Sequence, residues 1–418
     1  MHRRVLALCV VLTGCRPSGH GAAESSAVER AANPTAGDKA SCAEVPDSSF
    51  RLDRAALMRT PGAARLLEKL DASPHRYFRA LGRQYALRTC AAFHAVRPHL
   101  PSVAIHGDAH VEQFVVTPTT AGMEDFDQSG FGPAVIDIVR FAASLHLVCR
   151  EVSWPCRADF VVDRWLDAYR ESIDHPVPRQ IPALVARLRA SSPTEPSAWL
   201  AWADGLMTPL SAEQERSARA GWAEFEKVML DINPARAASY YEIVRVGALQ
   251  MGIGSGLETK LLFHLRGATD DPLDDAVVEA RSSKPAVVPE CSTQPMRVGT
   301  IWPLLFMTTL GSRMPDVFGT ATLSADRTQE FWLASWVAGY RELSVGDLQS
   351  EAELVELAED AARQLAGHFW VKFPESLRAI QRRLQLTGFD LVHDRARTLA
   401  RELADETFRE WQRFHDAN

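Results

Sequence analysis

The sequence predicts an α+β fold rich in helices, and three observations lead to this prediction. The composition is that of an ordinary globular protein, with 46% hydrophobic and 24% charged residues. Apolar residues recur at helical intervals over most of the chain from about residue 53. Two regions, 102–127 and 249–280, instead carry brief apolar runs between turn residues, which is typical of strands. The 418 residues suffice for one large domain or two lobes with a real core.

Helices are expected wherever apolar residues recur every three or four positions. The expected helical regions are 53–70, 76–97, 133–150, most of 157–248 with breaks near 176–182 and 191–196, and the chain from 326 to a last helix at about 389–415. Asp326 and Gln329 have the spacing of a capping box. One face of the last helix gathers Val392, Ala396, Leu399, Leu403 and Trp411.

Strands are expected as short apolar runs bounded by turn residues. They are a strand at 103–105 and a hairpin with its turn at 118–122 in the first region, and a glycine turn at 252–256 with strands at 261–265 and 276–279 in the second.

The N-terminus reads as a targeting segment. Arg3 and Arg4 precede an apolar stretch that is far shorter than the roughly 20 residues needed to span a bilayer. The run Leu12 to Cys15 resembles the lipobox of bacterial lipoproteins, which implies that Cys15 carries a lipid. The resemblance implies a lipid anchor in the cell envelope, facing the periplasm from the outer membrane because residue 16 is Arg rather than Asp. An ordinary N-terminal helix is the alternative.

The chain is therefore expected to have three parts. They are a signal peptide at 1–14, the lipidated Cys15 with a flexible tether over 15–48, and a folded domain at 49–418. The tether is rich in Ala, Ser, Gly and Pro, and it lacks the apolar residues that would order it. Within the domain, the informative segments are 102–150, 244–285 and the helical part at 326–415. A net charge of −7 argues against nucleic acid as the main partner.

The cysteines are compatible with an oxidising compartment. Besides Cys9 and Cys15, the chain has Cys42, Cys90, Cys149, Cys156 and Cys291. One or two disulfides are expected among these five, and one thiol must remain, but the pairing cannot be derived from the sequence.

Three carboxylates and a histidine are concentrated in a short stretch of strands and turns. They are Asp108, His110, Asp125 and Asp127. Taken alone, each Asp would be read as a turn residue. Together, carboxylates that converge at strand ends favour a divalent cation with oxygen ligands, such as Mg²⁺, Ca²⁺ or Mn²⁺. An Asp close to such a site can orient or deprotonate a hydroxyl nucleophile.

The run HGDAHVEQ, His106 to Gln113, resembles the HGDxHxxN loop of aminoglycoside-phosphotransferase kinases, and Asp125 to Asp127 resembles their metal-binding turn. The resemblance implies a protein-kinase-like fold that uses Mg²⁺ and ATP. It implies Asp108, with His110 beside it, as the catalytic group, and Asp125, Asp127 and residue 113 as metal contacts. Residue 113 is Gln here rather than Asn. Asp137 resembles the Asp that braces the catalytic loop.

A closer resemblance is to the bacterial domain-of-unknown-function 2252 family. The residues that carry it are Ser73 to Ala80, Gly107 to Phe114, Asp125 to Ser144, the glycine turn Gln250 to Gly256, and Asp271 to Ala280. The similarity is expected to extend over roughly 55–415.

The glycine turn follows the catalytic loop by about 145 positions, whereas in ordinary kinases it comes first. The resemblance therefore implies a circularly permuted kinase-like fold. In that context Gly252, Gly254 and Gly256 would let backbone N–H groups approach phosphate, although alone they indicate only a tight turn.

One departure concerns the nucleotide-binding lysine. The family has Lys before Glu279, and this chain has Val278. Lys260 is a candidate replacement, or else a solvated strand residue, and Arg281 and Lys284 are further candidates. Arg76 and Arg79 either bind an anionic substrate or form a solvated helix face, whereas His264 and His368 are expected to be structural.

Three functions remain open from the sequence. The first is a phosphotransferase acting on an unknown small-molecule or protein hydroxyl. The second is a pseudokinase that binds a nucleotide or another ligand without catalysis, which the missing lysine, Gln113 and the extracytoplasmic address favour. The third is a metal-dependent hydrolase built on the His106, Asp108, His110 and Asp125 side chains.

Overall fold

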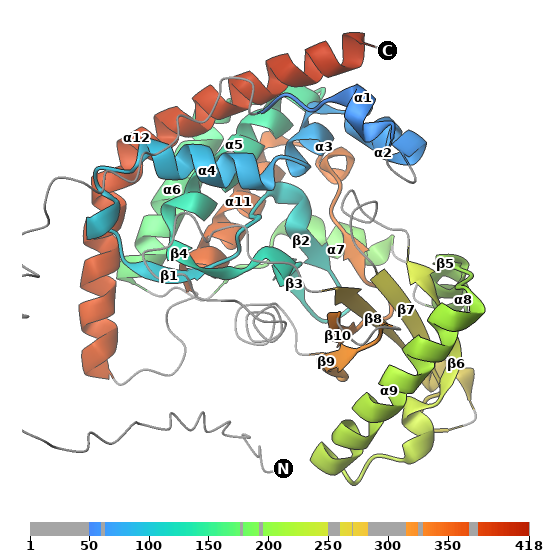
Figure 1. The fold of residues 1–418 in the computed structure, drawn as a ribbon. Helices are drawn as coiled ribbons and strands as arrows, with labels where there is room; N and C mark the ends of the chain where they lie inside the picture. Colours follow the sequence, from blue (N-terminus) through green and yellow to red (C-terminus); the bar gives the residue numbers. More distant parts are fainter. Residues whose placement is uncertain are drawn as a thin grey trace, which may run out of the picture. The chain divides into compact units, whose positions relative to one another are not determined.

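The computed structural model describes residues 50–59, 63–175, 179–191, 195–249, 260–269, 271–282, 315–324, 329–367 and 375–417. All of them belong to one compact unit, Val45–Asn418. Helices and antiparallel sheets are both present, so the α+β prediction is confirmed (Figure 1).

Most helices pack together around one large apolar core. They are α1 (Arg54–Leu57), α2 (Ala63–Asp71), α3 (Pro74–Arg79), α4 (Gly82–Ala92), α5 (Val135–Glu151), α6 (Ala158–Asp174), α7 (Ala183–Ala190), α11 (Glu351–Ala366) and α12 (Glu375–Asp416). Helix α5 is buried along nearly its whole length because α4, α6 and α12 all pack against it. The stripe predicted for the last helix is buried from Val392 to Leu403, and it faces this core.

A six-stranded antiparallel sheet forms a second layer with its own helices. In spatial order its strands are β5 (Met207–Thr208), β6 (Ile243–Leu249), β7 (Lys260–Leu265), β8 (Ala276–Ser282), β10 (Glu330–Ser335) and β9 (Phe318–Thr322). Helix α9 (Ala212–Ile232) covers one face through Trp222 and Phe225 (Figure 1). Helix α8 (Pro196–Gly205) covers part of the other face through Trp199 and Leu200.

Two small sheets carry the loops with the candidate catalytic and metal-binding residues. Strand β1 (Ser102–Ile105) pairs with β4 (Gly130–Pro133). Strand β2 (Phe114–Val116) pairs on one side with β3 (Ala121–Met123) and on the other with β11 (Arg341–Glu342). Short 3₁₀ turns complete the described chain; they are η2 (Arg97–His99), η3 (Val111–Gln113), η4 (Phe126–Gln128), η5 (Ala238–Tyr241), η7 (Pro272–Asp274) and η8 (Val345–Asp347).

Several expected boundaries are wrong. The helix expected at 76–97 is two helices, because the chain leaves helical geometry between Arg79 and Gly82. Residues 243–248 lay in the region expected to be mainly helical, but they belong to strand β6, which pairs with β7. Strands β10 and β11 also lie where helices were expected after 326. Asp326 of the expected capping box lies outside the described residues.

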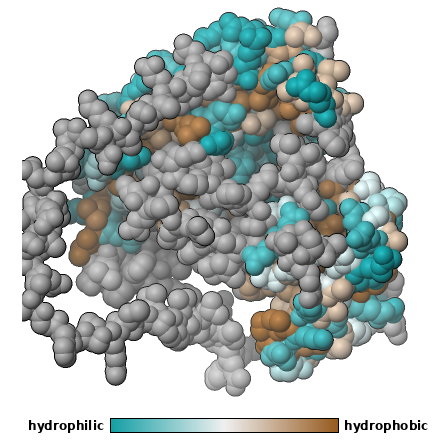
Figure 2. All heavy atoms as spheres, viewed as in Figure 1, coloured by the Kyte–Doolittle hydropathy of each residue, from teal (hydrophilic) through white to brown (hydrophobic). Residues whose placement is uncertain are grey.

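The disulfide pattern is partly defined. Cys149, near the end of α5, is bonded to Cys156 with a Cα–Cα distance of 5.2 Å. Cys90 is also disulfide-bonded. In the described part of the chain, no helix is long and apolar enough to cross a membrane. On the face shown in Figure 2, the described surface is a mosaic of hydrophilic and hydrophobic residues.

Candidate active site

The loop that follows β1 is held tightly against the turn after β3. Gly107 has φ +81°, and a Cβ added there would lie 2.0 Å from the carbonyl oxygen of Gln128. Only glycine combines that left-handed backbone with so close an approach. The loop carrying Asp108 and the turn carrying Asp125 are therefore packed backbone against backbone.

Asp137, in the first turn of α5, braces the same loop. Its carboxylate accepts hydrogen bonds from the backbone N–H groups of His106 at 2.7 Å and Gly107 at 2.9 Å. The side chain is only 3% exposed, and this burial raises its pKa, against the opposing effect of His106 and the two N–H donors. Helix α5 thus fixes the direction in which the loop leaves β1.

His106 joins the loop to the metal-binding turn expected from the sequence. Its Nε2 donates to the carbonyl oxygen of Glu124 at 2.8 Å, and its Nδ1 accepts from the N–H of Asp108 at 3.3 Å. Because a carbonyl can only accept, these two bonds define the tautomer that carries hydrogen on Nε2. Both ring nitrogens are occupied by backbone groups, so His106 positions the two acidic segments relative to each other.

Asp108 is paired with a deeply buried arginine. Arg140 Nε donates to Asp108 Oδ1 at 2.6 Å, and its Nη2 also contacts that oxygen. The Arg140 side chain is 1% exposed, and its guanidinium lies 4.2 Å from the Phe78 ring centroid and 5.3 Å from that of Tyr85. A guanidinium held between aromatic rings and a carboxylate is well suited to burial. The pair fixes Oδ1 and leaves Oδ2 facing Gln113.

Gln113 links Asp108 to the neighbouring turn. Its Nε2 donates to Asp108 Oδ2 at 3.3 Å. In this orientation the Oε1 oxygen is the atom of the amide that can coordinate a metal ion. The backbone carbonyl of Gln113 accepts from the N–H of Glu124 at 2.9 Å, one residue before Asp125. The extra methylene of Gln relative to Asn therefore does not stop the side chain from reaching Asp108.

Asp125 has a backbone conformation that side chains rarely adopt. At φ 65° and ψ 60° it is left-handed, and it is the one non-glycine residue with positive φ among the described residues. Such strain persists where packing imposes it, and it is concentrated at functional positions. The next residue, Phe126, packs on Trp332 and Ala334 of β10, which holds the turn against the large sheet.

The Asp125 carboxylate meets charges from the sheet. Arg281 Nη1 on β8 contacts Asp125 Oδ1, and the Asp125 side chain is 28% exposed. Burial alone would raise the pKa of Asp125, but Arg281 and then Lys260 outweigh it and lower the pKa to about 2. Asp125 is therefore ionised and already has a cationic partner.

The sheet presents two cations and one carboxylate in this place. Lys260 on β7 lies directly opposite Arg281, so the two side chains share one face. Glu279 accepts from Arg281 Nε at 2.6 Å and from Trp336 Nε1 at 2.9 Å, and its Oε1 lies 4.0 Å from Lys260 Nζ. We refer to Lys260, Glu279 and Arg281 as the sheet cluster.

Val278 lies on the opposite face of β8. Its side chain is fully buried with Phe263 and Trp222 in the core under α9. Since successive side chains alternate between faces, Arg281 and Glu279 point to one side of β8 and Val278 to the other. The valine at 278 therefore does not leave the site without a cation, because Lys260 and Arg281 face it.

His110 lies behind the site rather than in it. It is fully buried, and its Nε2 is 3.7 Å from Asp108 Oδ2. Burial, followed by the Arg79 charge, lowers its pKa well below the ordinary value, so the ring is neutral. The ring of His75 packs edge-on against His110, and its Nδ1 lies 3.5 Å from Glu112 Oε2. The same Glu112 oxygen accepts a hydrogen bond from Arg79 at 2.9 Å. Arg79 therefore forms an ion pair with Glu112 inside the fold.

Other predicted residues lie elsewhere. His264 lies between Asp204 of α8 and Asp275, with hydrogen bonds of 3.0 and 2.8 Å. Outside the described residues are Cys15, Gly252, Gly254, Gly256, Lys284, His368 and the side chain of Asp127. The residues that sequence reasoning missed are Arg140 and Glu279, although both belong to the quoted motifs. Long-range pairing, which a motif does not encode, gives them their role.

The described residues offer few donors for a metal ion. Within the described ranges, no group of three or more His, Cys, Asp and Glu side chains is arranged to hold a metal ion. Mg²⁺ commonly uses one or two protein carboxylates together with waters and substrate phosphates. Asp125 and the Gln113 amide oxygen are donors of that kind, so the residues present fit magnesium held jointly with a phosphate.

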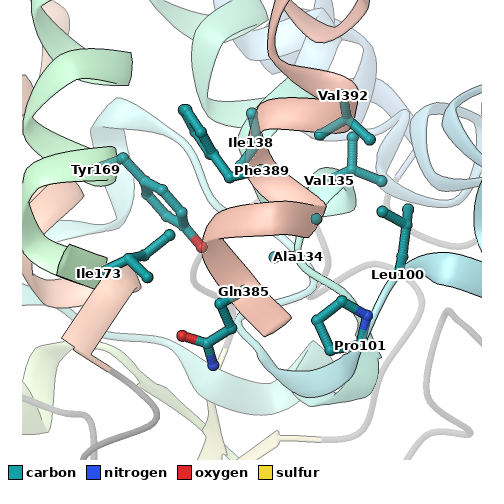
Figure 3. A pocket seen from close by; sticks show the side chains of 11 residues that line it. Leu100, Pro101, Ala134, Val135, Ile138, Tyr169, Ile173, Gln385, Phe389 and Val392 are labelled. Atoms are coloured by element: carbon teal, nitrogen blue, oxygen red, sulfur yellow. The ribbon is translucent and has the colours of Figure 1, made fainter. Parts of the chain in front are cut away.

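A separate cavity of about 20 Å³ lies among α5, α6 and α12 (Figure 3). Its lining is mainly apolar, including Val135, Ile138, Phe389 and Val392. A space of this size holds about one water molecule. It is therefore a packing defect of the helical core rather than a substrate site.

One comparison with known proteins gives a match, and it covers the segment that carries Asp108 and Asp125. No curated protein and no solved structure matches the chain. The similarity expected over 55–415 is found over a shorter stretch, which contains the Asp108 loop, the Asp125 turn and helix α5. Residues 59–191 of this chain match the family described as an uncharacterized protein conserved in bacteria (DUF2252).

Proposed function

We propose that this protein is a magnesium-dependent phosphotransferase that uses ATP and acts on a hydroxyl group of a small molecule or a protein. One observation carries the proposal: Asp108 and Asp125 lie on two loops joined through His106, and the cations of the sheet cluster face Asp125. Phosphoryl transfer depends mainly on positioning and electrostatic stabilisation, and those are the properties of this site.

Each residue has a role in this proposal. Asp108 orients the acceptor hydroxyl through Oδ2, since Oδ1 is held by Arg140. Asp125 and Gln113 hold the magnesium ion, which when bound neutralises charge on the phosphate oxygens. Arg281 and Lys260 supply the positive charge for the donor phosphates that a kinase-like site requires.

The kinase-like fold in permuted order is part of the proposal. In protein kinases a glycine-rich loop covers the phosphates and the cationic side chain lies on the third strand. Here the glycine sequence joins β6 to β7, and Arg281 lies on β8, the third strand in that succession. These strands follow the Asp108 loop in the chain, as a permutation requires.

A pseudokinase is the second candidate, and a specific observation favours it. Both acidic residues already have arginine partners, Arg140 for Asp108 and Arg281 for Asp125. A module that binds a nucleotide without turnover would tolerate such pairing. The hydrolase has less support, because His106 uses both ring nitrogens on backbone groups and His110 is buried.

Thermal unfolding with ligands distinguishes these candidates. We expect Mg²⁺ with ATP to stabilise the wild type by about 2.7 kcal/mol at 100 times the Kd, and Asp125→Ala to abolish the effect. Asp163→Ala, which removes a 46% exposed carboxylate on α6, is the matched control and should keep it. No shift with any nucleotide would exclude both kinase-like candidates. Stabilisation by Zn²⁺ alone would favour the hydrolase.

Turnover then separates enzyme from pseudokinase. Asp108→Asn keeps the shape of the side chain while removing the carboxylate that orients the acceptor. We expect this variant to bind nucleotide and to lose phosphoryl transfer to a panel of hydroxyl acceptors. If the wild type binds nucleotide but transfers phosphate to no acceptor, including water, the pseudokinase replaces the enzyme.

We also propose that the protein is lipid-anchored in the cell envelope through Cys15 and has no other membrane attachment. The lipobox resemblance supports this, and so does the Cys149–Cys156 disulfide, since such bonds persist in oxidising compartments. Growth with a labelled fatty acid should label the wild type and leave Cys15→Ala unlabelled. An unlabelled wild type would disprove the anchor.

A further inference from the structure

Arg281 occupies the carboxylate that the proposed function gives to magnesium. Its Nη1 contacts Asp125 Oδ1 directly, and the guanidinium also lies 5.2 Å from the Trp332 ring centroid. The Arg281 side chain is 13% exposed and that of Asp125 is 28% exposed. The contact therefore lies within reach of solvent, unlike the Asp108–Arg140 pair.

Arg281 has a second anion within its own strand. Glu279 accepts from Arg281 Nε at 2.6 Å and from Nη2 at 3.2 Å. Glu279 is itself held by the indole of Trp336. These bonds use the Nε side of the guanidinium, whereas Nη1 makes the contact with Asp125. Arg281 can therefore release Asp125 and keep its attachment to the sheet.

The Asp125–Arg281 contact couples the binding of a divalent cation to the binding of a polyphosphate. A divalent cation at Asp125 and the Nη1 group of Arg281 compete for the same oxygen, because like charges repel at this distance. A polyphosphate that accepts from Nη1 removes the competitor. Phosphate oxygens are well matched to a guanidinium, which donates through a planar fork.

We infer that Arg281 exchanges partners, from Asp125 in the unliganded site to the phosphates of a bound polyphosphate, and thereby makes metal and polyphosphate binding mutually dependent. This inference rests on the proposed function and adds a regulation to that site. The metal alone binds weakly because Arg281 holds Asp125, and the polyphosphate alone binds weakly because Asp125 holds Arg281. By linkage, each ligand raises the affinity of the other by the same factor.

Lys260 provides the matched comparison. It carries the same charge and lies opposite Arg281 in the same cross-strand row. Its Nζ lies 4.0 Å from Glu279, and the direct ion pair of Asp125 is with Arg281. Removing Lys260 changes the local charge by the same amount without opening the Asp125 oxygen.

The experiment measures Mn²⁺ binding to the full chain by electron paramagnetic resonance, with and without a non-hydrolysable ATP analogue. We expect Arg281→Gln to bind Mn²⁺ alone about tenfold more tightly than the wild type, within the 5- to 150-fold range of ordinary coupling. Lys260→Gln should gain less than about threefold, through charge alone. The analogue should tighten Mn²⁺ binding in the wild type and much less in Arg281→Gln.

Other results would overturn the inference or the proposed function separately. Equal Mn²⁺ affinities in Arg281→Gln and the wild type overturn the partner exchange, even when the analogue binds and the proposed function stands. Equal gains in Arg281→Gln and Lys260→Gln overturn it as well. An analogue that binds neither the wild type nor any variant overturns the proposed function and, with it, the exchange to phosphate.

Arg281→Lys is a second test, which keeps the inference testable if Arg281→Gln fails to fold. Lysine keeps the charge beside Glu279, but its shorter side chain does not reach as far toward Asp125. It should therefore also bind Mn²⁺ alone more tightly than the wild type, while unfolding at a similar temperature. Arg281→Lys with wild-type Mn²⁺ affinity and wild-type coupling contradicts a role for the Asp125 contact.

Discussion

Replacing Gly107 by alanine tests whether the Asp108 loop depends on its close contact with the Asp125 turn. The new Cβ would meet the carbonyl oxygen of Gln128 at 2.0 Å and the carbonyl carbon at 2.8 Å, so the backbone must move. The left-handed φ of +81° alone costs an alanine about 1–2 kcal/mol. Movement also weakens the two hydrogen bonds to Asp137, each worth about 1 kcal/mol or more. We expect a total loss of about 3–5 kcal/mol.

Urea denaturation of the full chain measures this loss. Gly205→Ala is the matched control, because Gly205 ends helix α8 and an added Cβ would meet nothing within 4 Å. Alanine there should be neutral or stabilise by up to about 1 kcal/mol. If Gly107→Ala lies within about 0.5 kcal/mol of the wild type, the loop adapts freely and the reasoning from the Gln128 contact is refuted.

Two further predictions concern stability. Replacing Cys149 and Cys156 by alanine opens a loop of seven residues and should lower the free energy of unfolding by roughly 2–3 kcal/mol, with reductant destabilising the wild type more than the variant. Burial lowers the pKa of His146 from 6.5 to about 4, so its contribution to stability is present above pH 6.5 and is lost as the pH falls toward 4. Between pH 7 and 4.5, the free energy of unfolding of His146→Leu should therefore fall by roughly 2–3 kcal/mol less than that of the wild type, whereas a variant of the 79% exposed His175 should follow the wild type.

Features encoded by neighbouring residues were predictable from the sequence. Strand β1, the β2–β3 hairpin and helix α5 lie where the local patterns placed them. Each is defined by a run of apolar residues next to glycine, proline or aspartate, within about 20 residues. The pattern of the Asp108 loop and Asp137 also lies within one such stretch, and the structure joins them by backbone hydrogen bonds.

Features that depend on sheet register were not predictable. Arg281 meets Asp125 across 156 residues, and only the pairing of β7, β8 and β10 decides which face of β8 the arginine occupies. A single-residue shift in register would exchange Arg281 for Ala280 and bury the charge. Strand β6 was mistaken for helix for a related reason, since its partner β7 lies beyond the glycine turn.

The two arginine–aspartate pairs differ in a way that bears on the proposed phosphoryl transfer. Arg140 is 1% exposed and lies among aromatic rings, so its pairing with Asp108 is permanent, because separating a buried pair leaves an uncompensated charge. Arg281 is partly exposed and has Glu279 as a second partner, so its pairing with Asp125 can be exchanged. A binding module that never loads metal would have no need of this difference. A loose transition state for phosphoryl transfer needs little basicity from Asp108, which is compatible with a permanent Arg140 partner. It does require Asp125 to bind a cation, which is compatible with an Arg281 partner that can leave.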